Sequence, residues 1–229
     1  ENLKSLGISK INRNMIESIP GNNTFHNRLF KLASVFGNHC PLFSDGSAVI
    51  QYLIPFVNCF PKYQLFTFEV TLSFIINFTQ PMWSHYPQPP SSFLTTLAKE
   101  FSRINGLGEW MREKEISFVK VIWPLLTSIC WEIMIEETWL KMMDFLICYI
   151  DKPAVFCLFV CNLVADFNEP IRRLKNAKEV YSFFKRKQAV RIDNDIKSTF
   201  SSMKSSPFLA ELGFPEFTQL LSGHYQTLE

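Results

Sequence analysis

The chain has 229 residues, of which 47% are hydrophobic and 19% charged, and its net charge is +2 at pH 7. This length favours one large domain or two small ones, and the apolar fraction is enough for a sizeable core with little disorder. The near-zero charge gives no indication of a nucleic-acid partner. Eight glycines are too few for an all-β protein with many tight turns.

Apolar residues at helical spacing recur along the chain, and several of these segments have recognisable ends. Asn23 or Thr24 can cap the first helix and Gly37 can end it, while Ser47 and Ser92 are further candidate N-caps. The predicted helices cover residues 25–36, 65–78, 92–104, 139–150, 154–165 and 192–203. No alternation of period two lies between turn residues, so the fold class predicted from these segments is all-α.

Two of these segments are apolar on nearly every side. Residues 65–78 show no clear period, and their length favours a helix over a strand. The longest apolar run, residues 154–161, is much shorter than the roughly 20 residues that span a membrane. We therefore expect no transmembrane segment in a soluble chain, and a buried helix with residues 155–163 near the centre of the core.

Side chains that could support catalysis or bind a metal are scattered. His26, His39, His85 and His224 form no metal-ligand pair with another His or Cys at helical spacing. The sequence also contains neither a nucleophile elbow nor a P-loop. We predict no metal and no cofactor. Most of the six cysteines lie in apolar runs, which is typical of core thiols in a reducing, cytoplasmic compartment.

Lysine and arginine gather between residues 172 and 191, here called the basic stretch. Its members are Arg172, Arg173, Lys175, Lys178, Lys185, Arg186, Lys187 and Arg191. Glu179 interrupts the basic stretch, which favours a solvated face. The alternative is a docking surface for an acidic protein or for anionic lipid headgroups.

Three segments resemble motifs of the TBC domain, the domain of Rab GTPase-activating proteins (Rab GAPs). Residues 11–20 lie on the frame I-x-x-D-x-x-R-T-x-P, with the isoleucine and the proline in place. Residues 43–46 occupy the position of the family's Y-x-Q-G motif, ahead of an apolar helix. Residues 139–144 resemble the family's helix that carries a tryptophan and an aspartate. Together the matches span most of residues 11–204.

The resemblance implies that the two catalytic positions of the family are degenerate. In working members an arginine and a glutamine act as fingers on the γ-phosphate and the attacking water; here Glu17 and Asp45 stand in those positions. Asn14 stands for the preceding aspartate. An ionised carboxylate has no hydrogen-bond donor, and at ~4 Å it would repel a phosphate charge by ~4 kcal/mol at an intermediate dielectric. We therefore expect an inactive pseudo-GAP. The alternative is an active GAP whose displaced fingers are Arg13, one turn before Glu17, and Gln51.

Within the family, the chain is most similar to the branch in which the TBC domain follows WD repeats and precedes a coiled coil, found at centrosomes and centriolar satellites. The segments behind this likeness are residues 54–57, 68–70, 75–77, 80–83, 87–90, 123–126, 139–141 and 225–227. The resemblance implies one TBC-like domain over residues 1–229, excised from a longer protein.

Its motif-bearing part is expected at about residues 1–110 and its C-terminal helical part at about 111–229. The implied role is a scaffold with protein partners, either a Rab-class GTPase or centrosomal or ciliary proteins. The implied place is the cytoplasm at the centrosome, centriolar satellites or basal body. The oligomeric state stays open, and a helical adaptor outside the family is the third alternative.

Overall fold

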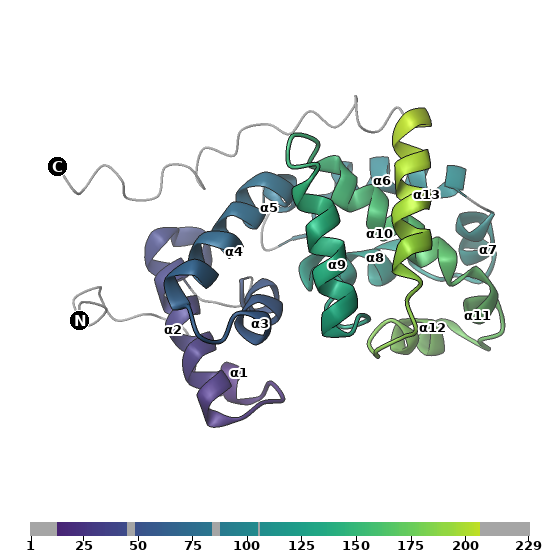
Figure 1. Ribbon diagram of the computed structural model, residues 1–229. Helices are drawn as coiled ribbons and strands as arrows, with labels where there is room; N and C mark the ends of the chain where they lie inside the picture. Colours follow the sequence, from purple (N-terminus) through teal and green to yellow (C-terminus); the bar gives the residue numbers. More distant parts are fainter. Residues whose placement is uncertain (1–12, 45–48, 84–87, 105, 207–229) are drawn as a thin grey trace. The chain divides into compact units, whose positions relative to one another are not determined.

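The computed structural model describes residues 13–44, 49–83, 88–104 and 106–206 (Figure 1). Within these ranges every regular element is a helix and no strand occurs, so the predicted all-α class is confirmed. The described residues fall into two compact units, one ending at Gln80 and one beginning at Pro81. A single domain over residues 1–229 stays a prediction.

The first unit is assembled around one long helix, α2 (Asn23–His39). Its other elements are α1 (Arg13–Glu17), the 3-10 helix η1 (Pro41–Phe43), α3 (Ile50–Cys59) and α4 (Gln64–Phe78), and all four contact α2. The short helix α5 (Gln80–Trp83) follows α4. Because residues 64–78 form α4, the choice of helix over strand for this apolar segment is confirmed.

The ends of α2 differ from those that the sequence predicts. Asn22 is the N-cap, because its side chain accepts a hydrogen bond of 2.9 Å from the backbone N–H of Phe25. At the other end the helix continues through Gly37 to His39, so Gly37 is not the C-terminal stop. The apolar face is as predicted, since Leu29 and Phe36 are fully buried.

The second unit contains the remaining helices of the described chain. They are α6 (Ser91–Ile104), α7 (Leu107–Glu113), α8 (Phe118–Thr127), α9 (Glu136–Ile147), α10 (Ala154–Asp166), α11 (Asn168–Arg172), α12 (Ala177–Phe183) and α13 (Ile192–Ser205). Helix α10 lies at the centre of this unit and packs against α6, α8, α11 and α13 (Figure 1).

The core position predicted for residues 155–163 is confirmed. Every residue of α10 from Ala154 to Val164 is buried. A helix that is apolar on all sides has to be covered on all sides, and α6, α8 and α13 supply that cover. In the described part of the chain, no helix is both long and apolar enough to cross a membrane.

The last helix, α13, exists as predicted but buries a different face. The apolar residues at helical spacing in this segment, Ile192, Ile196, Phe200 and Met203, predict the contact face. In the structure Phe200 is 44% exposed, and the buried positions are Ile192, Asp195 and Thr199. This partly polar face packs on α10, where the Ser202 hydroxyl donates to the side-chain oxygen of buried Asn162 at 3.3 Å. Apolar periodicity does not predict this contact face, because polar side chains form much of it.

Candidate functional site

The first candidate motif lies on α1, a helix of five residues. Ile16 is fully buried and anchors this short helix in the first unit, where it contacts α2. Asn14 and Glu17, which the motif resemblance puts in the family's aspartate and arginine positions, are exposed. The Ser18 hydroxyl donates to the carbonyl of Met15 at 2.7 Å and closes the end of the helix. The isoleucine of α1 is therefore a core anchor, while the polar side chains of Asn14 and Glu17 are exposed.

Arg13, the alternative finger, already has three partners. Its Nε lies 3.0 Å from Glu17 Oε1, and a terminal nitrogen donates to Asn27 Oδ1 at 2.9 Å. Its guanidinium also lies over the ring of Phe30, 5.7 Å from the centroid. The spacing argument that puts Arg13 and Glu17 on one face is thus confirmed, and the two charges form an ion pair.

The other finger positions are only partly described. Asp45 lies outside the described residues, so the convergence of Glu17 and Asp45 on one surface stays a prediction. Gln51, the alternative glutamine, is exposed in the first turn of α3. Ile50 and Leu53, which flank it on that helix, are fully buried.

The third motif has a structural role. Trp139 is fully buried, and its indole N–H donates to the carbonyl of Ile129 at 2.8 Å. Its ring also meets Trp131 edge to face, with centroids 5.6 Å apart. Ile129 and Cys130 have φ values of 50° and 58°, a left-handed conformation that costs energy for non-glycine residues. Trp139 therefore helps to hold a strained turn between α8 and α9.

Two members of the basic stretch, Arg172 and Lys187, form contacts that stabilise the fold. Arg172 donates to Asn168 at 2.6 Å and to the carbonyl of Gly106 at 3.3 Å, and it lies over the ring of Trp110. The Lys187 ammonium donates to the carbonyls of Trp131 and Met134 and also lies over the Trp131 ring, 4.3 Å from its centroid.

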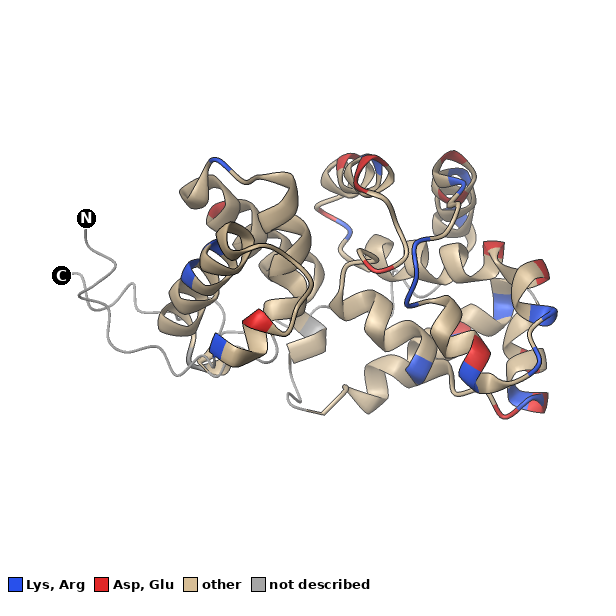
Figure 2. Ribbon diagram, turned by 90° about the horizontal axis from the view of Figure 1, so that it is seen from below, with Lys and Arg blue, Asp and Glu red and all other residues tan. Residues whose placement is uncertain are grey.

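The rest of the basic stretch is mixed with acidic residues. Arg173 is 3.8 Å from Glu169, and both side chains are about four-fifths exposed. Arg191 forms a closer pair with Asp166, at 2.5 Å. Figure 2 shows Asp and Glu segments interspersed with Lys and Arg segments in this unit. Lys175, Lys178, Lys185 and Arg186 are exposed. Whether any of these cations docks a partner stays a prediction.

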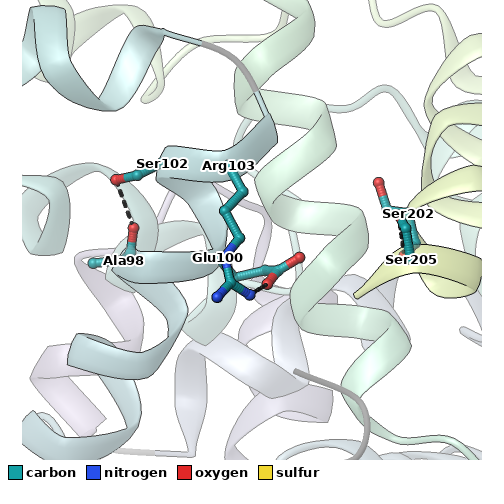
Figure 3. Close-up of polar contacts among 6 residues, drawn as sticks. All are labelled: Ala98, Glu100, Ser102, Arg103, Ser202 and Ser205. Atoms are coloured by element: carbon teal, nitrogen blue, oxygen red, sulfur yellow. Dashed lines mark hydrogen bonds and ion pairs between the residues drawn. The ribbon is translucent and has the colours of Figure 1, made fainter. Parts of the chain in front are cut away.

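Sequence reasoning gave no indication of a polar cavity between α6, α10 and α13. Its volume is about 530 Å³, and its lining includes Glu100, Arg103, Asn162, Lys197, Ser201 and Ser202. Figure 3 shows Glu100 and Arg103 together on α6, with Ser202 and Ser205 on α13; the Glu100–Arg103 pair spans 3.3 Å.

The polar groups of this cavity are largely paired within the protein. The Ser201 hydroxyl donates to the carbonyl of Lys197, and the Ser205 hydroxyl donates to that of Ser202. The lining contains no histidine or cysteine that could act as base or nucleophile. The arrangement is a solvated polar groove rather than a catalytic centre.

Comparison with known proteins agrees with the TBC resemblance. The chain is similar to "TBC1 domain family member 31" of mouse (23% identity over 180 residues, 78% of this chain and 18% of the relative). It is similarly related to the human protein of that name (24% over 180 residues, 78% and 17%) and to that of Xenopus tropicalis (24% over 208 residues, 86% and 18%).

The chain thus spans less than a fifth of the length of these relatives. No family model matches the chain, and no solved structure matches it. The named relatives confirm the resemblance to TBC-domain proteins that the motifs indicate.

Proposed function

We propose that this relative of TBC-domain proteins is a catalytically inactive, Rab-GAP-like module that acts by binding other proteins. The motif resemblance puts the carboxylate of Glu17 in the finger position, and one observation carries the proposal from there: Arg13, one turn before Glu17, is paired with it at 3.0 Å. A finger must place a positive charge beside the transferring phosphate. Here the charge of Arg13 is offset by the adjacent carboxylate of Glu17.

The Arg13–Glu17 pair contributes little to stability, but the positive charge that it offsets would matter greatly for catalysis. The Arg13–Glu17 pair is exposed, so it stabilises the fold by only ~0.3–0.5 kcal/mol and does not lock the arginine. A positioned arginine finger accelerates GTP hydrolysis by roughly 10³- to 10⁵-fold, which is worth ~4–7 kcal/mol. Because Glu17 lies one turn from Arg13 on the same helix, a phosphate that reaches Arg13 would also meet the negative charge of Glu17, which reduces the stabilisation of the transition state.

The second candidate function is an active GAP that uses Arg13 and Gln51. It is favoured by the exposure of both side chains in the first unit. It requires Arg13 to exchange Asn27 and Glu17 for the phosphate. The two functions differ in one measurable property, the rate of GTP hydrolysis by a bound Rab.

Restoring the missing fingers provides the test. Single-turnover GTP hydrolysis is measured for a panel of Rab GTPases with the wild-type chain and with the double variant Glu17→Arg, Asp45→Gln. We expect wild type to leave every Rab at its intrinsic rate. Stimulation of ~100-fold or more by wild type would contradict the proposal, because such a rate requires a positioned finger. A gain by the double variant alone would show that the GTPase-binding surface survives.

We further propose that this chain is part of a longer protein, and that this protein acts as a scaffold at centrosomes or centriolar satellites. This proposal rests on the likeness to the WD-repeat branch of the family. The test is fluorescence microscopy of the tagged full-length protein beside a centriolar-satellite marker. A diffuse cytoplasmic signal at endogenous expression would contradict it.

A further inference from the structure

The first unit contains an apolar cavity away from α1. Its volume is about 380 Å³, which lies within the range of pockets that bind small-molecule ligands. Its walls are α2, the end of α3 with the turn that follows it, and α4. The apolar lining residues are Leu32, Val35, Val57, Phe60, Leu65 and Phe68.

Large apolar side chains are exposed at this cavity and beside it. Leu65, which lines it, is 70% exposed, and its neighbours Tyr63 and Phe66 are 68% and 47% exposed. Phe66 is held in place by an edge-to-face contact with Phe60 at 5.2 Å. Contiguous exposed apolar surface around a hollow is a feature of binding sites, because its burial against a partner is favourable.

Three basic residues lie in the lining of the same cavity or next to it. Arg28 and Lys31 line it from α2, three residues apart and hence on one face. Lys62 lies in the turn that contributes the lining residue Pro61. These three are three of the four lysine and arginine residues between positions 13 and 80. Within the described residues none of the three forms an ion pair, and Glu69 of α4 does not line the cavity.

We propose that this cavity is a docking site for an acidic segment of a partner protein, which inserts Leu or Phe side chains between α2 and α4. An amphipathic helix with apolar anchors at helical spacing fits an apolar groove of this kind. Flanking Asp or Glu residues would pair with Arg28, Lys31 and Lys62. Three cations are fewer than the cluster of roughly four to eight that marks an anionic membrane surface, so the charge favours a peptide over a lipid headgroup.

This inference goes beyond the proposed function, because an active or an inactive GAP could use such a site equally. The α1 motif does not line the cavity. Loss of peptide binding would therefore leave GTP hydrolysis unchanged, and the failure of either proposal can be recognised without the other.

The test is selection from a displayed library of random 16-residue peptides on the whole chain, with counter-selection against the Leu65→Ser variant. Leu65 is exposed, so this change removes an anchor contact without opening the core. We expect enriched peptides to be net negative and to carry Leu or Phe three or four residues apart. Absence of enrichment, or enrichment of neutral or basic sequences, would overturn the proposal.

A synthetic peptide of the enriched sequence then gives the affinity by fluorescence anisotropy. We expect Leu65→Ser, and separately Arg28→Glu with Lys31→Glu, to weaken binding at least 10-fold, and higher salt to weaken it in wild type. Ile147→Ser, which changes an exposed residue of α9, and Lys178→Glu are matched controls that should leave affinity unchanged. Equal binding by all variants would overturn the site.

Vesicles of phosphatidylcholine with and without phosphatidylserine, used with the same variants, distinguish a membrane ligand. Binding to the anionic vesicles that depends on Arg28 and Lys31, with no peptide binding, would replace the partner protein by a lipid surface and overturn the proposal.

Discussion

Helices α4 and α10 are both strongly apolar, yet they are buried differently. From Ala154 to Val164, every residue of α10 is buried. In α4 the buried residues are Thr67, Thr71, Phe74, Ile75 and Phe78, while Leu65 and Phe66 remain exposed. The length of an apolar run therefore predicts a helix, whereas the elements packed around that helix decide which of its surfaces is covered.

Two buried threonines, Thr67 and Thr71, explain why Leu65 of α4 is left exposed. The Thr67 hydroxyl donates to the carbonyl of Tyr63 at 2.8 Å, and the Thr71 hydroxyl donates to that of Thr67 at 2.6 Å. Because these hydroxyls are paired within the chain, burying them carries little of the cost of an unpaired polar group. The first half of α4 therefore packs through threonines, and Leu65 is left at the cavity.

The largest expected loss of stability tests this difference in burial between α10 and α4. Leu158→Ala, in the centre of α10, should lower the free energy of unfolding by ~2–5 kcal/mol, because it leaves a cavity in a closely packed core. Leu65→Ala should lower it by less than ~0.5 kcal/mol, because that side chain is exposed. Chemical denaturation followed by circular dichroism measures both. Equal losses would mean that α4 is as buried as α10.

A buried carboxyl beside α10 gives the next effect. Asp195 is 1% exposed, and its Oδ2 has no hydrogen-bond partner within the described residues. Burial, helped by the charge of Asp166 and opposed by that of Arg191, raises the pKa of Asp195 from 3.8 to about 7. Between those values the folded protein keeps a proton that the unfolded chain has lost, so stability should fall as the pH rises from about 4 to about 7.

The variant Asp195→Asn removes this charge. It should raise the free energy of unfolding at pH 8 by on the order of 4 kcal/mol relative to wild type, with little difference at pH 4. Urea denaturation at several pH values measures the slope. The exposed residue Asp193 on the same helix provides the control, and Asp193→Asn should keep the wild-type slope. A steep slope in the Asp195 variant would assign the pH dependence to another group.

Within the basic stretch, the hydrogen bonds of a residue rather than its charge should decide how much its substitution changes stability. Lys187→Ala removes the donor to the carbonyls of Trp131 and Met134 and should cost about 1–2 kcal/mol. Lys178→Glu and Arg186→Glu, at exposed positions, should each change stability by less than ~0.5 kcal/mol. Thermal unfolding measures all three. A large loss from the two charge reversals would show that the basic stretch is more than a solvated face.

A smaller loss of stability than for Lys187→Ala is expected at α1. Arg13→Ala breaks the exposed pair with Glu17 and the contact with Asn27, and it should lower the free energy of unfolding by ~0.5–1 kcal/mol. Differential scanning calorimetry of the variant beside Glu17→Gln separates the pair from the Asn27 contact. A loss above ~2 kcal/mol would show that α1 is a larger part of the core than its single buried residue indicates.

The sequence was informative where burial follows apolar pattern. It predicted α10 and the helical state of α4 correctly, since both depend on long apolar runs. It was wrong about Gly37, because the helix hydrogen bonds continue past it to Cys40. It was also wrong about the contact face of α13, because Asp195, Thr199 and Ser202 pack there in place of Phe200.

The candidate site was predictable in part. Helical spacing put Arg13 and Glu17 on one face, and their ion pair follows from it. The role of Asn27 could not be predicted, because it lies on another helix and depends on how α1 packs against α2. The cavity at Leu65 was hidden for the same reason, since its walls come from three segments that only the fold brings together.

The central claim, that the chain acts by binding and not by catalysis, is tested most directly by phosphate release from a GTP-loaded Rab panel with wild type and Arg13→Ala. Arg13 is paired at 3.0 Å with Glu17, which the motif resemblance puts in the finger position. The account predicts the intrinsic rate with both proteins, at every concentration of the chain. Stimulation of ~100-fold or more by wild type that is lost in Arg13→Ala would contradict it and identify Arg13 as the working finger.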